Sequence, residues 1–276
     1  MDWLAGRSLK DALLDVQQQV RKEPAQYRHR VYLFQLLAVL GQWDRALNQL
    51  NVLSEMDPSL LPMVHTYRHA LQGEALRVAI FAGRRKPLVF GEPERWVALL
   101  LEALRLGAED AREQAKALRA EALDLAPLSP GRISDPAGEP FAWIADADER
   151  LGPMLEAFID GKYYWVPFAQ MASLRLEAPE DLRDLVWMPA LFEWRNGGQS
   201  SGLVPTRYPG TENSDDDRVL RAALTRWVDV GGGDYVGEGQ RLLVTDVDDY
   251  ALMDIRELTF EQPEVQPAGI TPEQAD

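Results

Sequence analysis

Two histidines four residues apart are the first residues in this sequence that could do chemistry. His65 and His69 flank Thr-Tyr-Arg, and at this spacing on a helix both imidazoles lie on one face, where they could bind one metal ion. The segment lacks the glutamate that zinc proteases place directly after the first histidine, and no third ligand is evident. We therefore interpret the pair as partly exposed histidines on a helix surface.

Two groups of carboxylates could hold a divalent cation or act as general acid and base. They are Asp146-Ala-Asp148-Glu149 and Asp246-Val-Asp248-Asp249. Neither group has the glycine turn and regular spacing of an EF-hand loop, and carboxylates at loop edges are common. A metal-dependent hydrolase that uses these groups is the alternative class of function.

The other candidate motifs fit structural roles better than catalytic ones. Ser214 precedes three aspartates, which suits the N-cap and first turn of a helix. Gly231–Gly233 lacks the Gly-Lys-Ser/Thr of a phosphate-binding loop. The sequence has no cysteine, which removes disulfides, thiolate catalysis and cysteine-bound metals. We expect no catalytic residues, no cofactor and no bound metal.

The charge of the chain is unevenly distributed. The formal net charge is −15 over 276 residues. Residues 1–128 hold 17 Lys+Arg and 16 Asp+Glu, whereas residues 129–276 hold 12 and 28. Such an acidic half repels nucleic-acid phosphates and anionic membranes, so we expect neither as a partner. The start does not resemble a signal peptide and no apolar stretch could span a bilayer, which predicts a cytoplasmic protein.

The elements that must position these residues differ between the two halves. In the first half, Gly41 ends one helix, Trp43 begins the next and Pro58 stops it. The same marks occur 34 residues earlier, from Leu9 to Pro24, and more weakly from Trp96 to Pro127. A 34-residue period of paired helices is the tetratricopeptide signature.

The second half has the pattern of a mixed, mainly antiparallel sheet. Asp160-Gly161 predicts a hairpin turn, and a second turn is expected at Asn196-Gly197-Gly198. Further strands are expected at Arg241–Val247 and Tyr250–Phe260, with helices at Pro179–Leu185 and Ser214–Trp227. The predicted fold class is α+β. The predicted organisation is a tetratricopeptide-like helical repeat domain (1–128), a Pro- and Gly-rich linker (129–140), an α+β domain (141–261) and a flexible tail (262–276).

Stacked helix pairs form a curved array whose inner groove is lined by the first helix of each pair, and such grooves bind peptides or helices. With Tyr27 as the first position of its repeat, the groove-facing residues include Arg28, Val31 and Gln35. The same register from Leu61 adds His65 and His69. The groove is mixed to apolar, which suits the apolar face of an amphipathic helix.

Four blocks of the second half resemble the ImpE/TagJ family of bacterial type VI secretion accessory proteins. The blocks are residues 142–156, 161–168, 179–189 and 203–212. The resemblance implies a cytoplasmic, non-enzymatic adaptor that binds the N-terminal helix of the small contractile-sheath subunit. It also implies a link to the AAA+ ATPase that recycles contracted sheath.

Our hypothesis is that the partner contacts Arg28, Val31, Gln35, His65 and His69. The rival site is the sheet domain, through an edge strand or the aromatic residues Tyr163, Tyr164 and Trp165. A general chaperone-like repeat protein without a secretion role is the other alternative.

Overall fold

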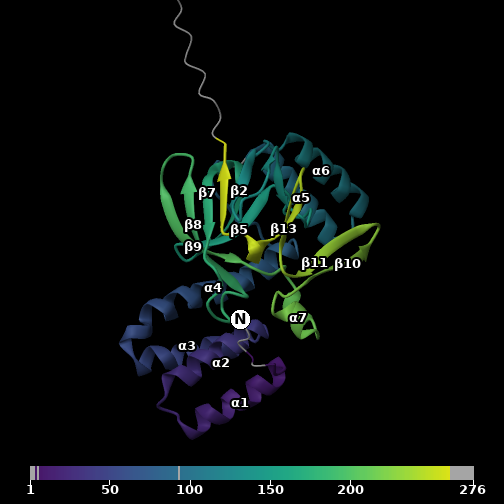
Figure 1. Cartoon of the computed structure of the whole chain (residues 1–276). Coiled ribbons are helices and arrows are strands. Elements are labelled where there is room, and N and C mark those ends of the chain that lie inside the picture. Colours follow the sequence, from purple (N-terminus) through teal and green to yellow (C-terminus); the bar gives the residue numbers. More distant parts are fainter. Residues whose placement is uncertain (1–3, 5, 93, 262–276) are drawn as a thin grey trace, which may run out of the picture.

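Helices form the N-terminal half of the chain and strands form most of the C-terminal half (Figure 1). The computed structural model describes residues 4, 6–92 and 94–261. The predicted α+β fold class is therefore confirmed, while the predicted flexible tail lies outside the described residues.

Six α-helices lie within residues 9–125, before every strand of the large sheet except the short strand Leu88–Val89. Ser8 caps the first helix by accepting a hydrogen bond from the backbone N–H of Asp11, and Gly41 has the positive φ (65°) that ends the second. The helices are α1 (Leu9–Lys22), α2 (Tyr27–Val39), α3 (Trp43–Met56), α4 (Leu61–Phe81), α5 (Arg95–Ala108) and α6 (Arg112–Leu125).

The helical series is interrupted after α4. This helix has 21 residues, more than the neighbouring helices, and the chain then forms the short strand β1 (Leu88–Val89) where a second helix of the pair would stand. Strand β1 pairs in parallel with the large sheet. The helices of the first half are therefore attached to the sheet by hydrogen bonds in the middle of their series.

The strands form one large sheet and two small ones. The large sheet has nine strands in the order β1-β6-β5-β9-β8-β7-β14-β2-β3, and β1–β6 is its parallel pair. A three-stranded sheet has the order β13-β12-β4, and β10 and β11 form a separate hairpin. The strands after β1 are β2 (Gly131–Asp135), β3 (Pro140–Phe141), β4 (Ile144–Asp146), β5 (Met154–Ile159), β6 (Lys162–Pro167), β7 (Met171–Leu176), β8 (Trp187–Trp194), β9 (Gln199–Pro205), β10 (Thr225–Gly231), β11 (Asp234–Gly239), β12 (Leu242–Thr245), β13 (Asp249–Ala251) and β14 (Glu257–Phe260).

The two predicted hairpin turns are confirmed. Asp160 and Gly161 have φ values of 49° and 73°, as a tight turn between β5 and β6 requires, and Asn196–Gly198 joins β8 to β9. The segment expected to be a linker contains strand β2, which pairs with β14. The predicted strand at Tyr250–Phe260 is divided between β13 and β14, which belong to different sheets.

Two predicted helices are wrong. Pro179–Leu185 forms turns, because the Asp184 carboxylate accepts hydrogen bonds from the backbone N–H groups of Glu180 and Asp181. In Ser214–Trp227, only α7 (Asp217–Leu220) is helical. The next segment pairs as β10, consistent with its β-branched and aromatic side chains.

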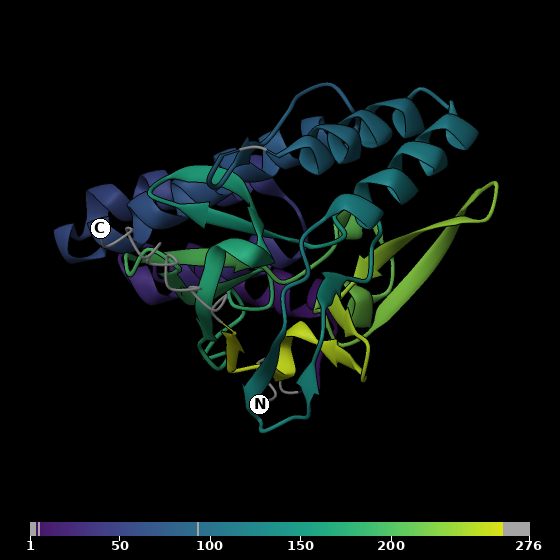
Figure 2. The same ribbon diagram turned by 90° about the horizontal axis from the view of Figure 1, so that it is seen from above.

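The helices and one face of the large sheet share a hydrophobic core. Along β5, Met154 and Phe158 belong to the core that includes the helices, whereas Leu155 and Ile159 belong to a second core on the other face. Viewed from above, the helices run along one side of the sheet (Figure 2). Strand β5 is therefore buried on both faces.

Candidate partner-binding site

Helix α4 meets the sheet closely along its C-terminal half. Gly73 makes this approach possible, because a Cβ atom built at this position would lie 2.0 Å from Cε1 of Phe158 on β5. Further along the helix, Glu74 and Arg77 are also buried against the sheet. The N-terminal half of α4 behaves differently, since His65, Thr66 and His69 are exposed.

A pocket of about 410 Å³ lies between this exposed part of α4 and the sheet. Its residues come from α4, β5, the β5–β6 turn and β9, and they are His65, Thr66, His69, Phe158, Asp160, Gly161, Ser201, Gly202 and Leu203. Phe158 and Leu203 are only 5% and 7% exposed, so they supply an apolar floor, and polar side chains supply the rim. This arrangement can accommodate an apolar side chain and hydrogen-bond its polar neighbours.

The β5–β6 turn forms one wall of the pocket. Gly161 lies close to the His69 ring, because a Cβ atom at this glycine would be 3.0 Å from Nδ1 of His69. The positive φ of 73° at Gly161 also disfavours any residue with a side chain. The turn predicted from Asp160-Gly161 therefore positions the pocket wall beside a predicted partner-binding histidine.

The five residues of the binding hypothesis have different surroundings. His65 and His69 lie together in the pocket, whereas Arg28 is exposed on α2 and Val31 is half-buried against the shared core. Gln35 is only 6% exposed. The C-terminal end of α2 is covered by the chain itself, since the Arg207 guanidinium donates to the carbonyl oxygen of Val39 at 2.7 Å.

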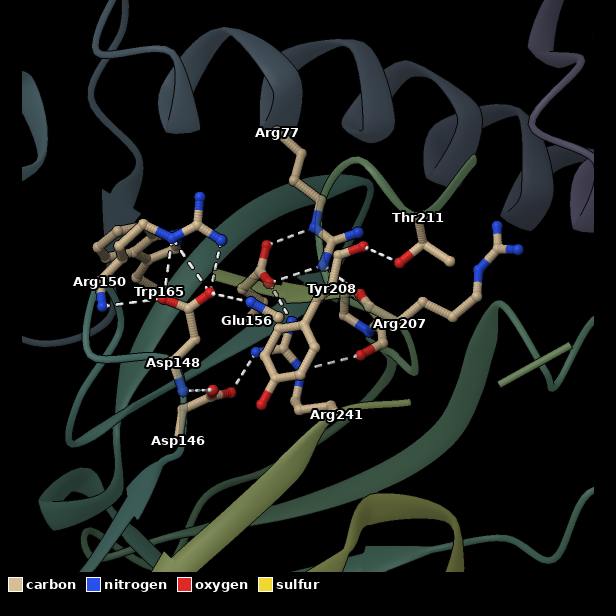
Figure 3. Close-up of polar contacts among 12 residues, drawn as sticks. Arg77, Asp146, Asp148, Arg150, Glu156, Trp165, Arg207, Tyr208, Thr211 and Arg241 are labelled. Atoms are coloured by element: carbon tan, nitrogen blue, oxygen red, sulfur yellow. Dashed lines mark hydrogen bonds and ion pairs between the residues drawn. The ribbon is translucent and has the colours of Figure 1, made fainter. Parts of the chain in front are cut away.

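A buried network of ion pairs connects α4 to the sheet (Figure 3). The Arg77 guanidinium donates to both carboxylate oxygens of Glu156, at 2.6 and 2.8 Å. Arg241 donates to Glu156 and to Asp146, and the Tyr163 hydroxyl donates to Glu156. Because these groups are shielded from water, the network fixes how α4 is placed on β5.

Burial and charge act in opposite directions on the carboxylates of this network. Burial would raise the pKa of Glu156, but the Arg77 and Arg241 guanidiniums outweigh it and lower the pKa to about 2. At Asp146 burial dominates over the attraction of Arg241 and raises the pKa to about 6. Burial also lowers the pKa of Arg207 to about 10.

Asp146, Asp148 and Asp246, from the two carboxylate groups noted in the sequence, have structural partners. Asp146 and Asp148 are buried, and Asp148 forms an ion pair with Arg150 at 2.5 Å. Asp246 accepts a hydrogen bond from the backbone N–H of Ala142 at 2.8 Å. Within residues 4, 6–92 and 94–261, no three His, Asp or Glu side chains gather closely enough to hold a metal ion.

Sequence reasoning missed the buried charges and misjudged the aromatic residues of β6. Glu156 interrupts an otherwise apolar strand, and such a residue needs a charged partner when both faces are buried; this was the available signal. Tyr163 and Trp165 are 2% and 0% exposed, so neither forms an external docking surface.

In the described part of the chain, no helix is both long and apolar enough to cross a membrane.

Comparison with known proteins finds relatives over most of the chain. Residues 138–259 match the ImpE protein family. The type VI secretion system accessory component TagJ of Pseudomonas aeruginosa is 52% identical over 257 residues, which cover 93% of this chain and 89% of that protein. The crystal structure of protein VPA1032 from Vibrio parahaemolyticus has the same fold, with a TM-score of 0.80, 23% identity, and coverage of 93% of this chain and 95% of that one. The chain therefore belongs to the ImpE/TagJ family of type VI secretion system accessory proteins.

Proposed function

We propose that this protein is a non-enzymatic cytoplasmic adaptor of a type VI secretion system that binds the N-terminal helix of the small sheath subunit. We further propose that it links this subunit to the AAA+ ATPase that recycles sheath. The observation that carries the proposal is the 52% identity to an accessory component of this system over nearly the whole chain.

The pocket beside α4 is the proposed docking site for the helix. An amphipathic helix recognised in a groove inserts apolar side chains at intervals of three or four residues. Phe158 and Leu203 would receive one such side chain, while His65 and His69 would contact the polar flank of the helix. Arg28 and Val31 on α2 would extend the contact, whereas the buried Gln35 would support it from within.

The test is a binding titration with a synthetic peptide of the cognate sheath subunit's N-terminal helix. The double variant His65→Ala/His69→Ala removes the imidazoles of the rim, and Ser201→Arg fills the pocket from the opposite strand. We expect each variant to lower the affinity for the peptide by about tenfold or more, as truncation of central interface residues typically does.

His29→Ala is the matched control, because the third histidine of the chain lies on α2 and contacts Glu23 outside the pocket. The control should bind the peptide as the wild type does. Undiminished binding by both pocket variants, with unchanged circular dichroism, would show that the helix docks elsewhere. No binding to the wild type would contradict the adaptor proposal itself.

A further inference from the structure

The β10–β11 hairpin extends beside the α5–α6 pair as a separate arm of the molecule (Figure 2). It exposes large apolar side chains, which a two-stranded hairpin has little means to bury. Trp227 is 38% exposed, Val230 40% and Tyr235 56%. Exposed tryptophan and tyrosine are the residue types that contribute most to protein interfaces.

The strand register places the two aromatic rings on one face of the hairpin. Trp227 lies opposite Gly237, and Asp229 lies opposite Tyr235. Directly opposed residues share a face, and so do residues two apart on a strand, so Trp227, Asp229 and Tyr235 share a face. The two rings are diagonal neighbours, a separation that aromatic side chains can bridge.

A pocket of about 380 Å³ lies against these rings. Its other side chains include the carboxylates of Glu149 and Asp234. Arg119 lies 3.2 Å from Glu149 and 3.3 Å from Asp234, and Lys116 lies 3.9 Å from Asp234. The Glu149 side chain is 70% exposed, so it can exchange Arg119 for another cation at little cost.

The surrounding chain is acidic. Residues 227–249 contain six Asp or Glu and one basic residue, Arg241, which is fully buried and bound to Asp146 and Glu156. The acidic side chains are Asp229, Asp234, Glu238, Asp246, Asp248 and Asp249. Asp234 and Glu238 pair with Arg119 and Arg226, whereas the exposed Asp229 shares the face of the two rings and accepts a hydrogen bond from the backbone N–H of Gly231. The carboxylates of Asp229 and of the exposed Glu149 therefore favour a cation at this face.

The aromatic face is supported from both ends. Tyr208 packs beside Trp227 on this face, with ring centroids 5.6 Å apart, and Gly237 leaves the space that the Tyr208 ring needs. At the tip, Arg112 donates to the carbonyl oxygen of Val230 and Lys116 to that of Gly232. The Trp227 ring and the tip of the hairpin are therefore held in place before a partner binds, which reduces the entropy lost on binding.

We infer that the pocket between Trp227, Tyr235 and Glu149 binds a Lys or Arg side chain on a segment of a partner protein. The aliphatic part of that side chain packs on the rings, and its cationic end lies on the ring faces and against the Glu149 carboxylate. This pocket shares no residue with the one beside α4, so the inference does not depend on the proposed sheath contact.

The experiment follows the indole N–H resonance of Trp227 in the full-length protein, assigned by its loss in Trp227→Phe. The probes are N-acetyl-lysine methylamide and its uncharged counterpart N-acetyl-norleucine methylamide. We expect a saturable shift with the lysine probe and none with norleucine. Tyr235→Ala and Glu149→Gln should each lower the affinity for the lysine probe by about fivefold, and Tyr235→Phe should bind the probe as the wild type does.

Glu139→Gln, an exposed acidic residue outside the pocket, is the control for general electrostatic attraction and should leave binding unchanged. The absence of a saturable shift with the lysine probe would overturn the inference. Equal shifts with norleucine would assign the pocket to apolar side chains instead. Unchanged binding in Tyr235→Ala would remove the aromatic pair from the site.

Discussion

Glu156 is the residue on which the contact between the helices and the sheet depends most. Its carboxylate is fully buried and accepts hydrogen bonds from Arg77 on α4, from Arg241 at the start of β12 and from Tyr163 on β6. Two buried guanidiniums thus share one carboxylate. Removal of that negative charge leaves both buried arginines with less compensation.

We predict that Glu156→Gln lowers the free energy of unfolding by about 3–5 kcal/mol at pH 7. The folded-state pKa of about 2 lies below the ordinary 4.5, so the Glu156 charge stabilises the fold fully above pH 4.5. Its contribution is lost as the pH falls from 4.5 toward 2. Urea unfolding at several pH values should therefore show the difference between wild type and variant shrinking below pH 4.5.

Glu102→Gln is the matched control for this prediction. Glu102 also pairs with an arginine, Arg105, but both side chains are substantially exposed, at 44% and 39%. Water screens such a pair, so its loss should lower the free energy of unfolding far less than Glu156→Gln does. Equal losses of stability in the two variants would mean that burial does not set the strength of the Glu156 contacts.

Among the secondary-structure elements, α4 has the closest contact with the sheet. Gly73 lets the helix approach β5 until the Phe158 ring occupies the space where a side chain would begin. A glycine inside a helix ordinarily lowers its stability by up to about 1 kcal/mol relative to alanine. Here the close packing against Phe158 offsets that cost.

We predict that Gly73→Ala destabilises the protein by about 1–3 kcal/mol, because the new methyl group overlaps a buried ring. Gly107→Ala, in α5, is the control: the nearest atom to its added Cβ is 3.9 Å away, and the substitution should stabilise by up to about 1 kcal/mol. Thermal unfolding measures both. Stabilisation by both alanines would show that α4 and β5 can separate without cost.

At the scale of the molecule, the predicted division at residues 128–141 coexists with a core shared by both halves. Phe34 on α2 contacts Tyr67 on α4, and Tyr67 contacts Trp187 at the start of β8, with ring centroids 5.6 and 5.7 Å apart. Trp187 also donates a hydrogen bond to Glu74. The helical half therefore buries much of its apolar surface against the sheet half.

We predict that the two halves unfold in one cooperative transition. The helices dominate far-UV circular dichroism, and the buried Trp165 and Trp187 at the shared core report on the contact between the halves by fluorescence. The two signals should give the same urea midpoint. Separate midpoints would instead support two independently stable domains, as would a folded fragment of residues 1–128.

Because the charge is unevenly distributed, we predict that the two proposed binding sites depend differently on salt. Residues 1–128 have nearly equal numbers of acidic and basic groups, whereas the excess of acids lies in residues 129–276. Salt screens exposed charges, so raising NaCl from about 50 to 500 mM should lower the affinity of the hairpin pocket for the lysine probe several-fold. Sheath-helix binding beside α4 should change by less than about threefold. A steep salt dependence of both would mean that carboxylates of the acidic half, such as Asp160 at the pocket beside α4, attract both ligands.

Local signals in the sequence were enough to determine many of the elements and the family. The helix ends at Gly41 and Pro58 and the turn at Asp160-Gly161 depend on backbone preferences of single residues and their neighbours, which act wherever those residues stand. The pair His65 and His69 was placed correctly on one exposed helix face by its spacing alone.

Only the tertiary structure decided what these elements contact. Arg77 and Glu156 are 79 positions apart, and no local preference predicts that pairing. The same holds for the burial of Gln35 in the core and for the place of residues 225–231 in a strand whose partner, β11, fixes its conformation. The physical reason is that buried charges and strand pairs gain their free energy from groups distant in sequence, and those groups meet only when the chain has folded.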